Sequence, residues 1–102
     1  MNSRIDTKYQ VDGTVEKYYV FGKLNAERHY VNDELNGLST IFYSDGSIKS
    51  EWNFKDGQKD GIGKQYSQDG LLVVEEDYDK GRKIMRRTFD AAGNATSVKQ
   101  FE

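Results

Sequence analysis

The sequence has 102 residues, of which 35 % are hydrophobic and 31 % are charged, with a formal net charge of -2 and no cysteine. A chain of this length fits one domain that buries roughly 60–65 % of the surface its unfolded form exposes, so a large enclosed pocket is not expected. The lack of cysteine excludes disulfides, thiolate metal sites and a cysteine nucleophile. The small net charge gives no global attraction to nucleic acid or anionic lipid.

The hydrophobic fraction is low for a thick globule, but aromatic side chains make up 13 % of the chain and there are 10 glycines. This combination favours a thin fold, such as a sheet packed on one face. No stretch approaches the roughly 18 apolar residues of a membrane span, and residues 1–10 lack an apolar run of signal-peptide length. We therefore expect a cytoplasmic location, although the processed form of a secreted protein would look the same.

Two regions differ in pattern along the chain. Residues 1–12 do not fit the repeat that follows and are predicted to form an N-terminal cap segment, with a strand through Tyr-Gln-Val at residues 9–11. From Gly13 onwards the sequence repeats with a period of 24 residues. The predicted repeat domain, residues 13–102, contains the units 13–36, 37–60, 61–84 and a shortened unit 85–102 that is expected to cap the C-terminal end.

Equivalent positions of the units carry the same residue types. Glycines open the first three units and recur at every mid-unit turn, at positions Gly13, Gly37 and Gly61 and at positions Gly22, Gly46, Gly70 and Gly93. Aromatic residues precede and follow each mid-unit turn, namely Tyr18, Phe42, Tyr66 and Phe89, and Tyr30, Phe54, Tyr78 and Phe101. Asp-Gly pairs between alternating segments are strong hairpin signals. The predicted fold class is all-β: a single-layer, twisted antiparallel meander of consecutive β-hairpins.

The second unit illustrates the expected hairpin. If residues 44–46 form a three-residue loop, Phe42 faces Ile48 and Leu38 faces Trp52 across the two strands. Strict alternation then puts aromatic and aliphatic side chains on one face and charged side chains on the other. Trp52 is expected in the core because it shares parity with Ile48 and Phe54, whereas Tyr43 shares parity with charged residues and is expected to be exposed.

The segment EWNFKDGQKDGIGKQYSQDG, residues 51–70, resembles the MORN repeat, and the period of 24 is similar to that of bacterial MORN-variant repeats in the YwqK-family antitoxins. The resemblance covers residues 13–84 well and residues 85–102 loosely. Only Gly61-Ile62-Gly63 has the Gly-x-Gly form of the standard repeat, which favours the variant. The resemblance implies an extended antiparallel sheet and a role in interaction, as an antitoxin or immunity protein that binds and blocks a cognate toxin. Standard MORN proteins instead imply a membrane-proximal or structural scaffold with lipid contacts, which is the alternative function.

The residues favour no catalytic, cofactor or metal site. With one histidine, His29, and no cysteine, only carboxylates remain as further ligands, which is a poor set for zinc. The registered glutamates Glu27, Glu51 and Glu75 are expected to be about 10 Å apart, because one strand lies between them and strands are roughly 4.8 Å apart. They are therefore expected to form ion pairs with basic residues on the intervening strands. No phosphate loop or nucleophile elbow occurs, so the protein is predicted not to be an enzyme.

Candidate partner-binding residues follow from charge and from aromatic content. The acidic run contains Glu75, Glu76, Asp77 and Asp79, and the basic run that follows it contains Lys80, Arg82, Lys83, Arg86 and Arg87. Either the two runs compensate each other around a solvated turn, or they lie on different surfaces and leave an acidic patch that docks on a basic toxin groove. Tyr43 is the preferred interface anchor, with Trp52 as a second candidate. Nucleic acid is not expected as a partner, membrane contact is the second choice, and homo-oligomerisation is left open.

Overall fold

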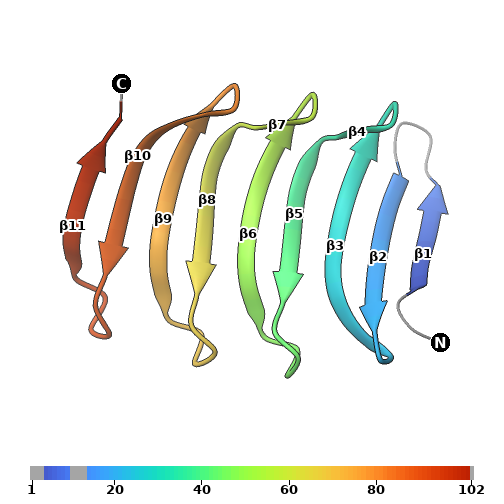
Figure 1. The fold of residues 1–102 in the computed structure, drawn as a ribbon, viewed down its shortest axis with the longest axis horizontal. Helices are drawn as coiled ribbons and strands as arrows, with labels where there is room; N and C mark the ends of the chain where they lie inside the picture. Colours follow the sequence, from blue (N-terminus) through green and yellow to red (C-terminus); the bar gives the residue numbers. More distant parts are fainter. Residues whose placement is uncertain (1–3, 10–13, 102) are drawn as a thin grey trace.

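Figure 1 shows the computed structural model, which describes residues 4–9 and 14–101, with side chains described from Val15 onwards. The strands are β1 (Arg4–Tyr9), β2 (Thr14–Val20), β3 (Lys23–Val31), β4 (Glu34–Leu35), β5 (Gly37–Phe42), β6 (Ile48–Lys55), β7 (Gln58–Lys59), β8 (Gly61–Tyr66), β9 (Leu72–Asp79), β10 (Arg82–Phe89) and β11 (Ala95–Gln100). They form one sheet in the order β1-β2-β3-β5-β6-β8-β9-β10-β11, with β4 beside β3 and β7 beside β6. Every pair is antiparallel. The predicted all-β meander of consecutive hairpins is confirmed.

The sheet is a single open layer, with principal extents of 41 × 31 × 19 Å. At the N-terminal end, β1 pairs with β2. Of the predicted strand at residues 9–11, only Tyr9 belongs to β1, and residues 10–11 lie outside the described part of the chain. Among the residues that the structure describes, there is no helix long and apolar enough to cross a membrane.

Two kinds of turn alternate along the chain. At the lower edge in Figure 1, the three-residue loops 44–46, 68–70 and 91–93 are closed by bonds such as that from Gly46 N to the Tyr43 carbonyl at 3.0 Å, whereas β2 and β3 are joined by two residues only, 21–22. At the upper edge, β6 and β7 are joined by the two residues Asp56 and Gly57, with φ values of 51° and 84°. Positive φ at both positions matches the right-handed twist of the strands, and the Asp-Gly pair tolerates it. The Asp-Gly pairs at 45–46 and 56–57 are therefore turns, as predicted.

The upper turns also bind one unit to the next. Gly57 N donates a hydrogen bond to the Leu35 carbonyl at 2.9 Å, and Gly81 N donates to the Lys59 carbonyl at 2.8 Å. The upper turns at 56–57 and 80–81 thus pack against the short strand of the preceding unit, β4 and β7 respectively. This contact repeats every 24 residues and does not depend on a side chain.

The predicted register of the second hairpin is correct at its turn and wrong beyond it. Phe42 faces Ile48 as expected, but Leu38 faces Asn53, and Trp52 faces Ser39. The cause is a β-bulge: Ile41 pairs with Ser50, so Lys49 has no partner on β5. One extra residue reverses the face of every residue beyond it. Shifts also occur in the β2–β3, β8–β9 and β10–β11 hairpins.

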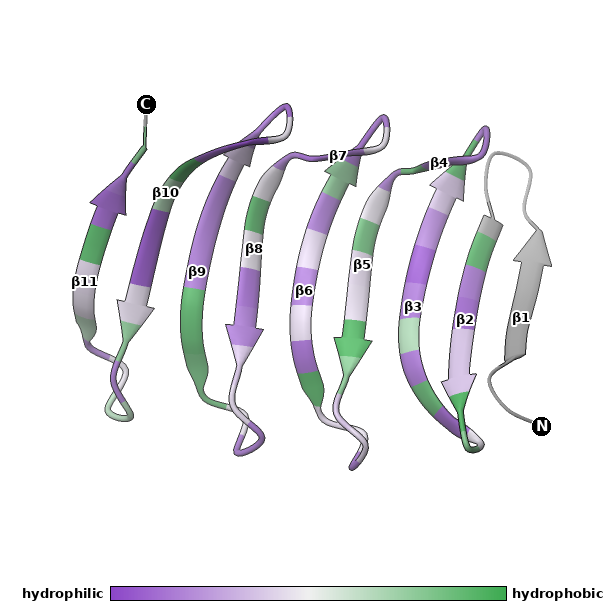
Figure 2. Ribbon diagram, in the orientation of Figure 1, coloured by the Kyte–Doolittle hydropathy of each residue, from purple (hydrophilic) through white to green (hydrophobic). Residues whose placement is uncertain are grey.

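The pairings divide the side chains between two faces. The Trp52 face is defined by side chains in register with Trp52, among them Glu16, Tyr18, Ala26, Arg28, Tyr30, Ser39, Ser50, Phe54, Lys59, Val74, Glu76, Tyr78, Lys83, Arg86, Lys99 and Phe101. The Glu51 face carries, among others, Lys17, Glu27, His29, Leu38, Thr40, Phe42, Ile48, Lys64, Tyr66, Glu75, Asp77 and Arg87. Both faces mix aromatic and charged residues. Figure 2 shows hydrophilic and hydrophobic residues interspersed along the strands. The predicted division into one apolar and one charged face is wrong, because the bulges reverse the alternation.

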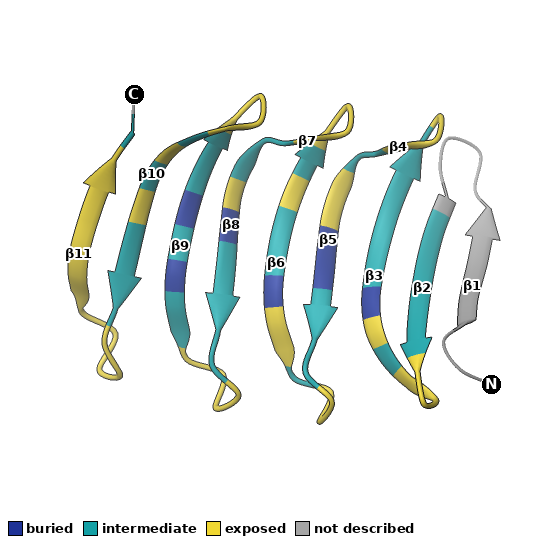
Figure 3. Ribbon diagram, in the orientation of Figure 1, coloured by how far each residue is buried: buried dark blue, intermediate teal, exposed yellow. Residues whose placement is uncertain are grey.

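Burial is confined to a narrow band across the middle of the sheet (Figure 3). Among the described side chains, Ala26 and Val74 are the buried hydrophobic ones, at 5 % and 6 % exposure, while Ser39, Thr40, Ser50 and Glu76 are the buried polar ones. A single layer has no second layer to cover it, so most side chains remain half-exposed. Stability must therefore come from contacts between neighbouring strands, as in other repeat folds.

Candidate functional site

The four acidic residues predicted to form a patch are divided between the faces. Glu75 and Asp77 lie on the Glu51 face, Glu76 lies on the Trp52 face, and Asp79 is exposed at the end of β9 beside the upper turn. Successive residues of a strand point to opposite sides, so a run of acids along β9 cannot form one surface.

Basic residues of β10 pair with two of these acids, Glu75 and Glu76. Glu76 is only 4 % exposed. Its Oε2 lies 3.0 Å from Lys83 Nζ and 3.7 Å from Arg86 Nε, and the Tyr78 hydroxyl donates to Oε1 at 3.1 Å. The hydrogen bond to Glu76 raises the pKa of the Lys83 ammonium. On the other face Arg87 Nη1 lies 3.1 Å from Glu75 Oε1.

The acidic and basic runs therefore do not lie on separate surfaces, as the acidic-patch hypothesis requires. They face each other across the β9–β10 pairing and compensate each other there. This corresponds to the other alternative, with the difference that the charges meet along two strands rather than only around the turn. An acidic surface made by Glu75, Glu76, Asp77 and Asp79 is absent from the described structure.

Tyr43 is less exposed than predicted. It is half-buried at the end of β5, and its hydroxyl donates to the Tyr66 carbonyl at 2.7 Å. Lys49 Nζ lies 5.8 Å from the centre of its ring. Because the hydroxyl already bonds to the neighbouring unit, Tyr43 connects adjacent hairpins.

Trp52 is half-buried at the centre of its face and lies over a glycine. A Cβ added to Gly63 would come within 2.3 Å of Trp52 Cε3, so the indole occupies the space above that residue. The indole Nε1 donates to Ser50 Oγ at 3.2 Å. Tyr78 packs edge-on against the indole, with ring centres 6.1 Å apart and planes at 76°. The Gly-x-Gly form of the third unit thus creates the space for the tryptophan of the second.

A row of alternating rings and lysines runs from Trp52 to the C-terminal edge of the sheet. Lys59 Nζ lies 3.7 Å from the centre of Trp52 and 5.1 Å from that of Tyr78. Lys83 Nζ lies 6.0 Å from the centre of Tyr78 and 5.5 Å from that of Phe101, and Lys99 Nζ lies 5.2 Å from Phe101. We call these residues the lysine–aromatic stripe: Trp52, Lys59, Tyr78, Lys83, Phe101 and Lys99.

The sequence analysis missed this stripe. Lys59 and Lys83 are 24 residues apart and so occupy the same position of the repeat, which is a signal that the sequence does contain. Lys99 carried no such signal, because its place opposite Arg86 depends on the bulge between β10 and β11. Of the predicted anchors, only Trp52 belongs to the stripe.

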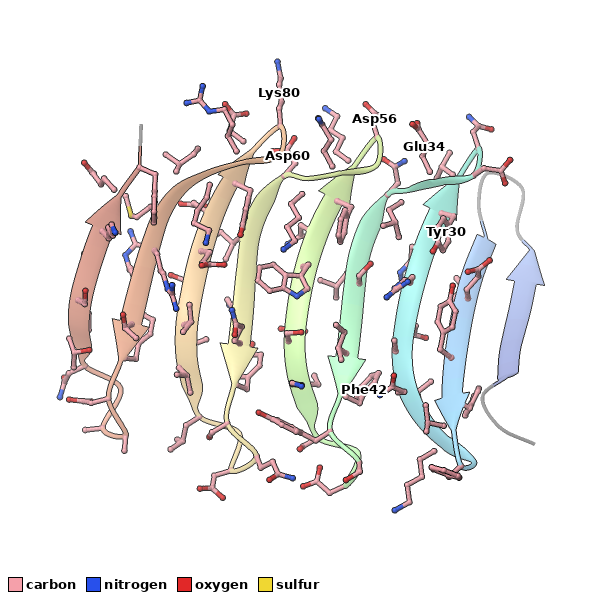
Figure 4. All side chains as sticks on the ribbon, in the orientation of Figure 1. Tyr30, Glu34, Phe42, Asp56, Asp60 and Lys80 are labelled. Atoms are coloured by element: carbon pink, nitrogen blue, oxygen red, sulfur yellow. The ribbon has the colours of Figure 1, made fainter. Side chains whose placement is uncertain are left out.

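The charges of the two faces differ. On the described part of the Trp52 face, the charged side chains in register with Trp52 are mostly basic: Lys23, Arg28, Lys59, Lys83, Arg86 and Lys99 against Glu16 and Glu76. The chain as a whole has a net charge of -2. The upper edge carries acids instead, including Glu34, Asp56 and Asp60, together with Lys80 (Figure 4). The Trp52 face is thus a basic surface on an acidic protein.

The glutamates of the Glu51 face are paired with other side chains of the sheet. Ion pairs hold Glu27 to Lys17 at 3.9 Å and Glu75 to Arg87 at 3.1 Å, as predicted. Glu51 differs, because its Oε1 accepts a hydrogen bond from the Tyr66 hydroxyl at 2.8 Å. Burial, and then this bond, raise the pKa of Tyr66 to about 12.

His29 has a structural role at the surface. The Leu38 carbonyl is an acceptor 2.7 Å from Nδ1, so Nδ1 carries the proton and donates. One unit later, Asn53 Nδ2 donates to the Ile62 carbonyl in the same way at 2.8 Å. His29 and Asn53 thus occupy equivalent positions of the repeat and make the same hydrogen bond to the next strand. Within the described ranges, no three His, Asp or Glu side chains are grouped so that they could hold a metal ion.

An open pocket of about 340 Å³ lies at the lower edge, lined by Lys23, Leu24, Phe42 and the turn residues 44–46. Figure 4 shows Phe42 at the lower end of β5. Hydrogen bonds from Ser47 lower the pKa of Asp45 in that turn, and the Asp45 carboxylate accepts from the Ser47 amide at 2.9 Å. Asp45 thus stabilises the turn itself.

Solved structures with similar folds were compared with this chain. TarM superposes with a TM-score of 0.60 at 17 % identity over 96 % of this chain and 21 % of that chain. A mutant of S. aureus TarM in complex with fondaparinux, α-GlcNAc-glycerol and UDP gives a TM-score of 0.63 at 15 % identity, over 98 % and 20 %. The accessory secretory proteins 1, 2 and 3 of Streptococcus pneumoniae give 0.58 at 16 % identity, over 95 % and 19 %. The chain thus spans about a fifth of the length of these proteins, and the likeness shows the fold alone.

Comparison with family descriptions concerns the N-terminal half. No curated protein sequence matches the chain significantly. The family described as the MORN repeat variant matches residues 11–32 and 35–56, which together are less than half of the chain. These two segments correspond to strands β2 to β6 of the sheet. Two segments of the chain thus match the MORN repeat variant, and MORN repeats are in general modules that bind proteins or lipids.

Proposed function

We propose that this protein is a non-catalytic binding module in the cytoplasm, that its partner is another protein, and that it acts as an antitoxin or immunity protein. The observation that carries the binding role is the Trp52 face. It combines aromatic rings with an excess of basic side chains, in a chain whose net charge is acidic. Aromatic residues and arginine are enriched at protein interfaces, and unbalanced charge selects a complementary partner.

The antitoxin role rests on the resemblance of residues 13–84 to the bacterial MORN-variant repeats. The MORN repeat variant matches at residues 11–32 and 35–56 support the repeat type and not the toxin. Because Glu75 and Glu76 are paired with β10 and the Trp52 face is basic, the partner surface in this proposal is acidic rather than basic.

The test is affinity purification of a tagged copy from its native host, followed by mass spectrometry. The expected result is one protein in equimolar amount, whose expression alone arrests growth and whose effect is relieved by co-expression of this chain. A tagged unrelated protein of similar size and charge is the control. Failure to recover a stoichiometric protein partner would reject the binding role, and a partner that does not arrest growth would reject the antitoxin role only.

A lipid-contacting scaffold is the second candidate, favoured by the excess of cations on the Trp52 face. It predicts sedimentation with phosphatidylserine vesicles that weakens as salt is added, because exposed charges are screened. Sedimentation that persists at high salt, or none at low salt, would contradict it.

A further inference from the structure

We propose that the lysine–aromatic stripe is the docking surface for an extended, acidic protein segment, whose carboxylates contact Lys59, Lys83 and Lys99. The proposal rests on the proposed function as a protein-binding module and names the surface and the chemistry of the partner. The stripe crosses strands β6 to β11 and ends beside β11, all six residues of which are exposed.

The repeat itself indicates that the lysines are not needed for packing. Lys59 faces Phe54 and Lys83 faces Tyr78, while in the first unit the same position opposite Tyr30 is occupied by Leu35. An aliphatic side chain is therefore paired with the aromatic residue in one unit, and a lysine takes that place in the next two. The repeat fold therefore does not require a positive charge at this position. Among the described units, the second and third carry a lysine there and the first does not.

Within the described ranges, two stripe lysines have no ion-pair partner. In the described part of the chain, Lys83 is paired with Glu76, but no ion pair within 4.0 Å involves Lys59 or Lys99. The ring below each ammonium group holds it in place through its negative face. A cation held in position over a ring loses less side-chain entropy on binding than a free surface lysine does.

The spacing fits an extended peptide. Consecutive stripe ammonium groups are separated by one aromatic ring, since Lys59 and Lys83 lie 5.1 and 6.0 Å from the centre of Tyr78. Lys83 and Lys99 likewise lie on either side of Phe101, at 5.5 and 5.2 Å. Equivalent positions of successive units are about 10 Å apart and side chains on one face of an extended segment recur about every 7 Å, so glutamates at alternate positions would meet successive lysines through the reach of both flexible side chains.

Two other polyanions fit the stripe less well. Single-stranded nucleic acid is bound by stacking bases on open aromatic faces, but ammonium groups lie over Trp52, Tyr78 and Phe101. Membrane surfaces are bound by apolar side chains that insert into the lipid, and these three rings are half-buried in the sheet. An acidic protein segment needs only the exposed ammonium groups and a linear path.

The experiment measures binding of a short labelled peptide of alternating glutamate and threonine by fluorescence anisotropy at low salt. The test variant combines Lys59→Leu, which installs the residue of the first unit, with Lys99→Leu. The matched control combines Lys55→Leu with Lys64→Leu, which removes the same charge from side chains outside the Trp52 face. Circular dichroism and thermal unfolding confirm that both variants are folded.

We expect the peptide to bind the wild-type chain and the control with similar affinity, and the test variant roughly tenfold more weakly, because two charge contacts are lost. A glutamine–threonine peptide should not bind. Equal weakening in both variants would overturn the proposal, because the net charge and not the stripe would then decide binding. Stronger binding of single-stranded DNA or of phosphatidylserine vesicles than of the acidic peptide would also overturn it.

A second readout separates this inference from the proposed function. The test variant and the control variant are used as baits in the affinity purification from the native host. Recovery of the partner by the control and not by the test variant supports both. Recovery by both variants rejects the stripe as the docking surface and leaves the proposed function intact. A wild-type bait that recovers no protein rejects the proposed function. In that case the peptide measurement decides whether the stripe binds an acidic segment.

Discussion

Replacing Gly63 by alanine should destabilise the protein, although alanine normally strengthens a strand relative to glycine by roughly 0.5–1 kcal/mol. The added Cβ would lie 2.3 Å from Trp52 Cε3 and 2.5 Å from Cζ3, whereas ordinary contacts begin at 3.4 Å. The indole must therefore move by about 1 Å. That movement strains the bond from Nε1 to Ser50 Oγ and the contact with Lys59 Nζ.

Overpacking of this kind costs about 1–3 kcal/mol, which exceeds the gain from the lower entropy of the unfolded alanine chain. The net loss in the free energy of unfolding should be about 1–2 kcal/mol. Urea unfolding followed by fluorescence measures it directly, because Trp52 is the only tryptophan. The control is Ser39→Ala at the equivalent position of the preceding unit, where Arg28 replaces the tryptophan.

A double-mutant cycle identifies the cause. In a Trp52→Leu background the space above position 63 is open, so Gly63→Ala should become neutral or stabilising. A coupling energy near zero, or a stabilised single variant, would refute the conclusion that the indole requires glycine there.

Three further predictions follow from the same contacts. Lys83→Met removes the ammonium group 3.0 Å from buried Glu76, so the free energy of unfolding measured in urea should fall by roughly 1.5–3 kcal/mol. The control, Arg82→Met at an exposed residue, should change this free energy little. Equal effects of the two substitutions would contradict the role of the buried carboxylate. Tyr66 has its pKa raised from 10.0 to about 12, so the folded state holds this proton more tightly than the unfolded state, and its stabilisation is complete below pH 10.0 and is lost as the pH rises towards 12. Tyrosinate absorbance should show several late-titrating tyrosines, because the pKa values of Tyr18 and Tyr78 are raised as well. Glu51→Gln should shift one of them to lower pH, and an unchanged titration would argue against the bond from Tyr66. Gly70→Ala forces a positive φ of 86° on alanine with nothing within 4 Å of the new Cβ, so thermal unfolding should report a loss of about 1–2 kcal/mol, and a silent substitution would mean that the turn relaxes.

The sequence by itself determined the architecture of this protein. A 24-residue period, Asp-Gly turns and alternating segments are local signals, and they predicted the antiparallel meander and the pairing of Phe42 with Ile48. The unit boundaries stay a prediction, although Gly37 and Gly61 begin β5 and β8 as the period suggests.

Only the tertiary structure decided which side chains share a face. Lys49 is the extra residue of a β-bulge. Because of this bulge, Trp52 and Ile48 lie on opposite faces, and Trp52 pairs with Ser39. Neighbouring residues of a strand point to opposite faces, so Glu75 and Glu76 cannot share one surface. The sequence alone could therefore have excluded the predicted acidic patch.

The lysine–aromatic stripe depends on the structure most of all. The period relates Lys59 to Lys83, but Lys59 meets Tyr78 only because the short strand β7 pairs with β6 and brings it there. Lys99 and Phe101 share a face by simple alternation, but that face is the Trp52 face only because of the β10–β11 bulge. A repeat specifies its hairpins through local turn chemistry, whereas the surface depends on bulges and cross-strand pairings, which are settled only when all the strands are in place.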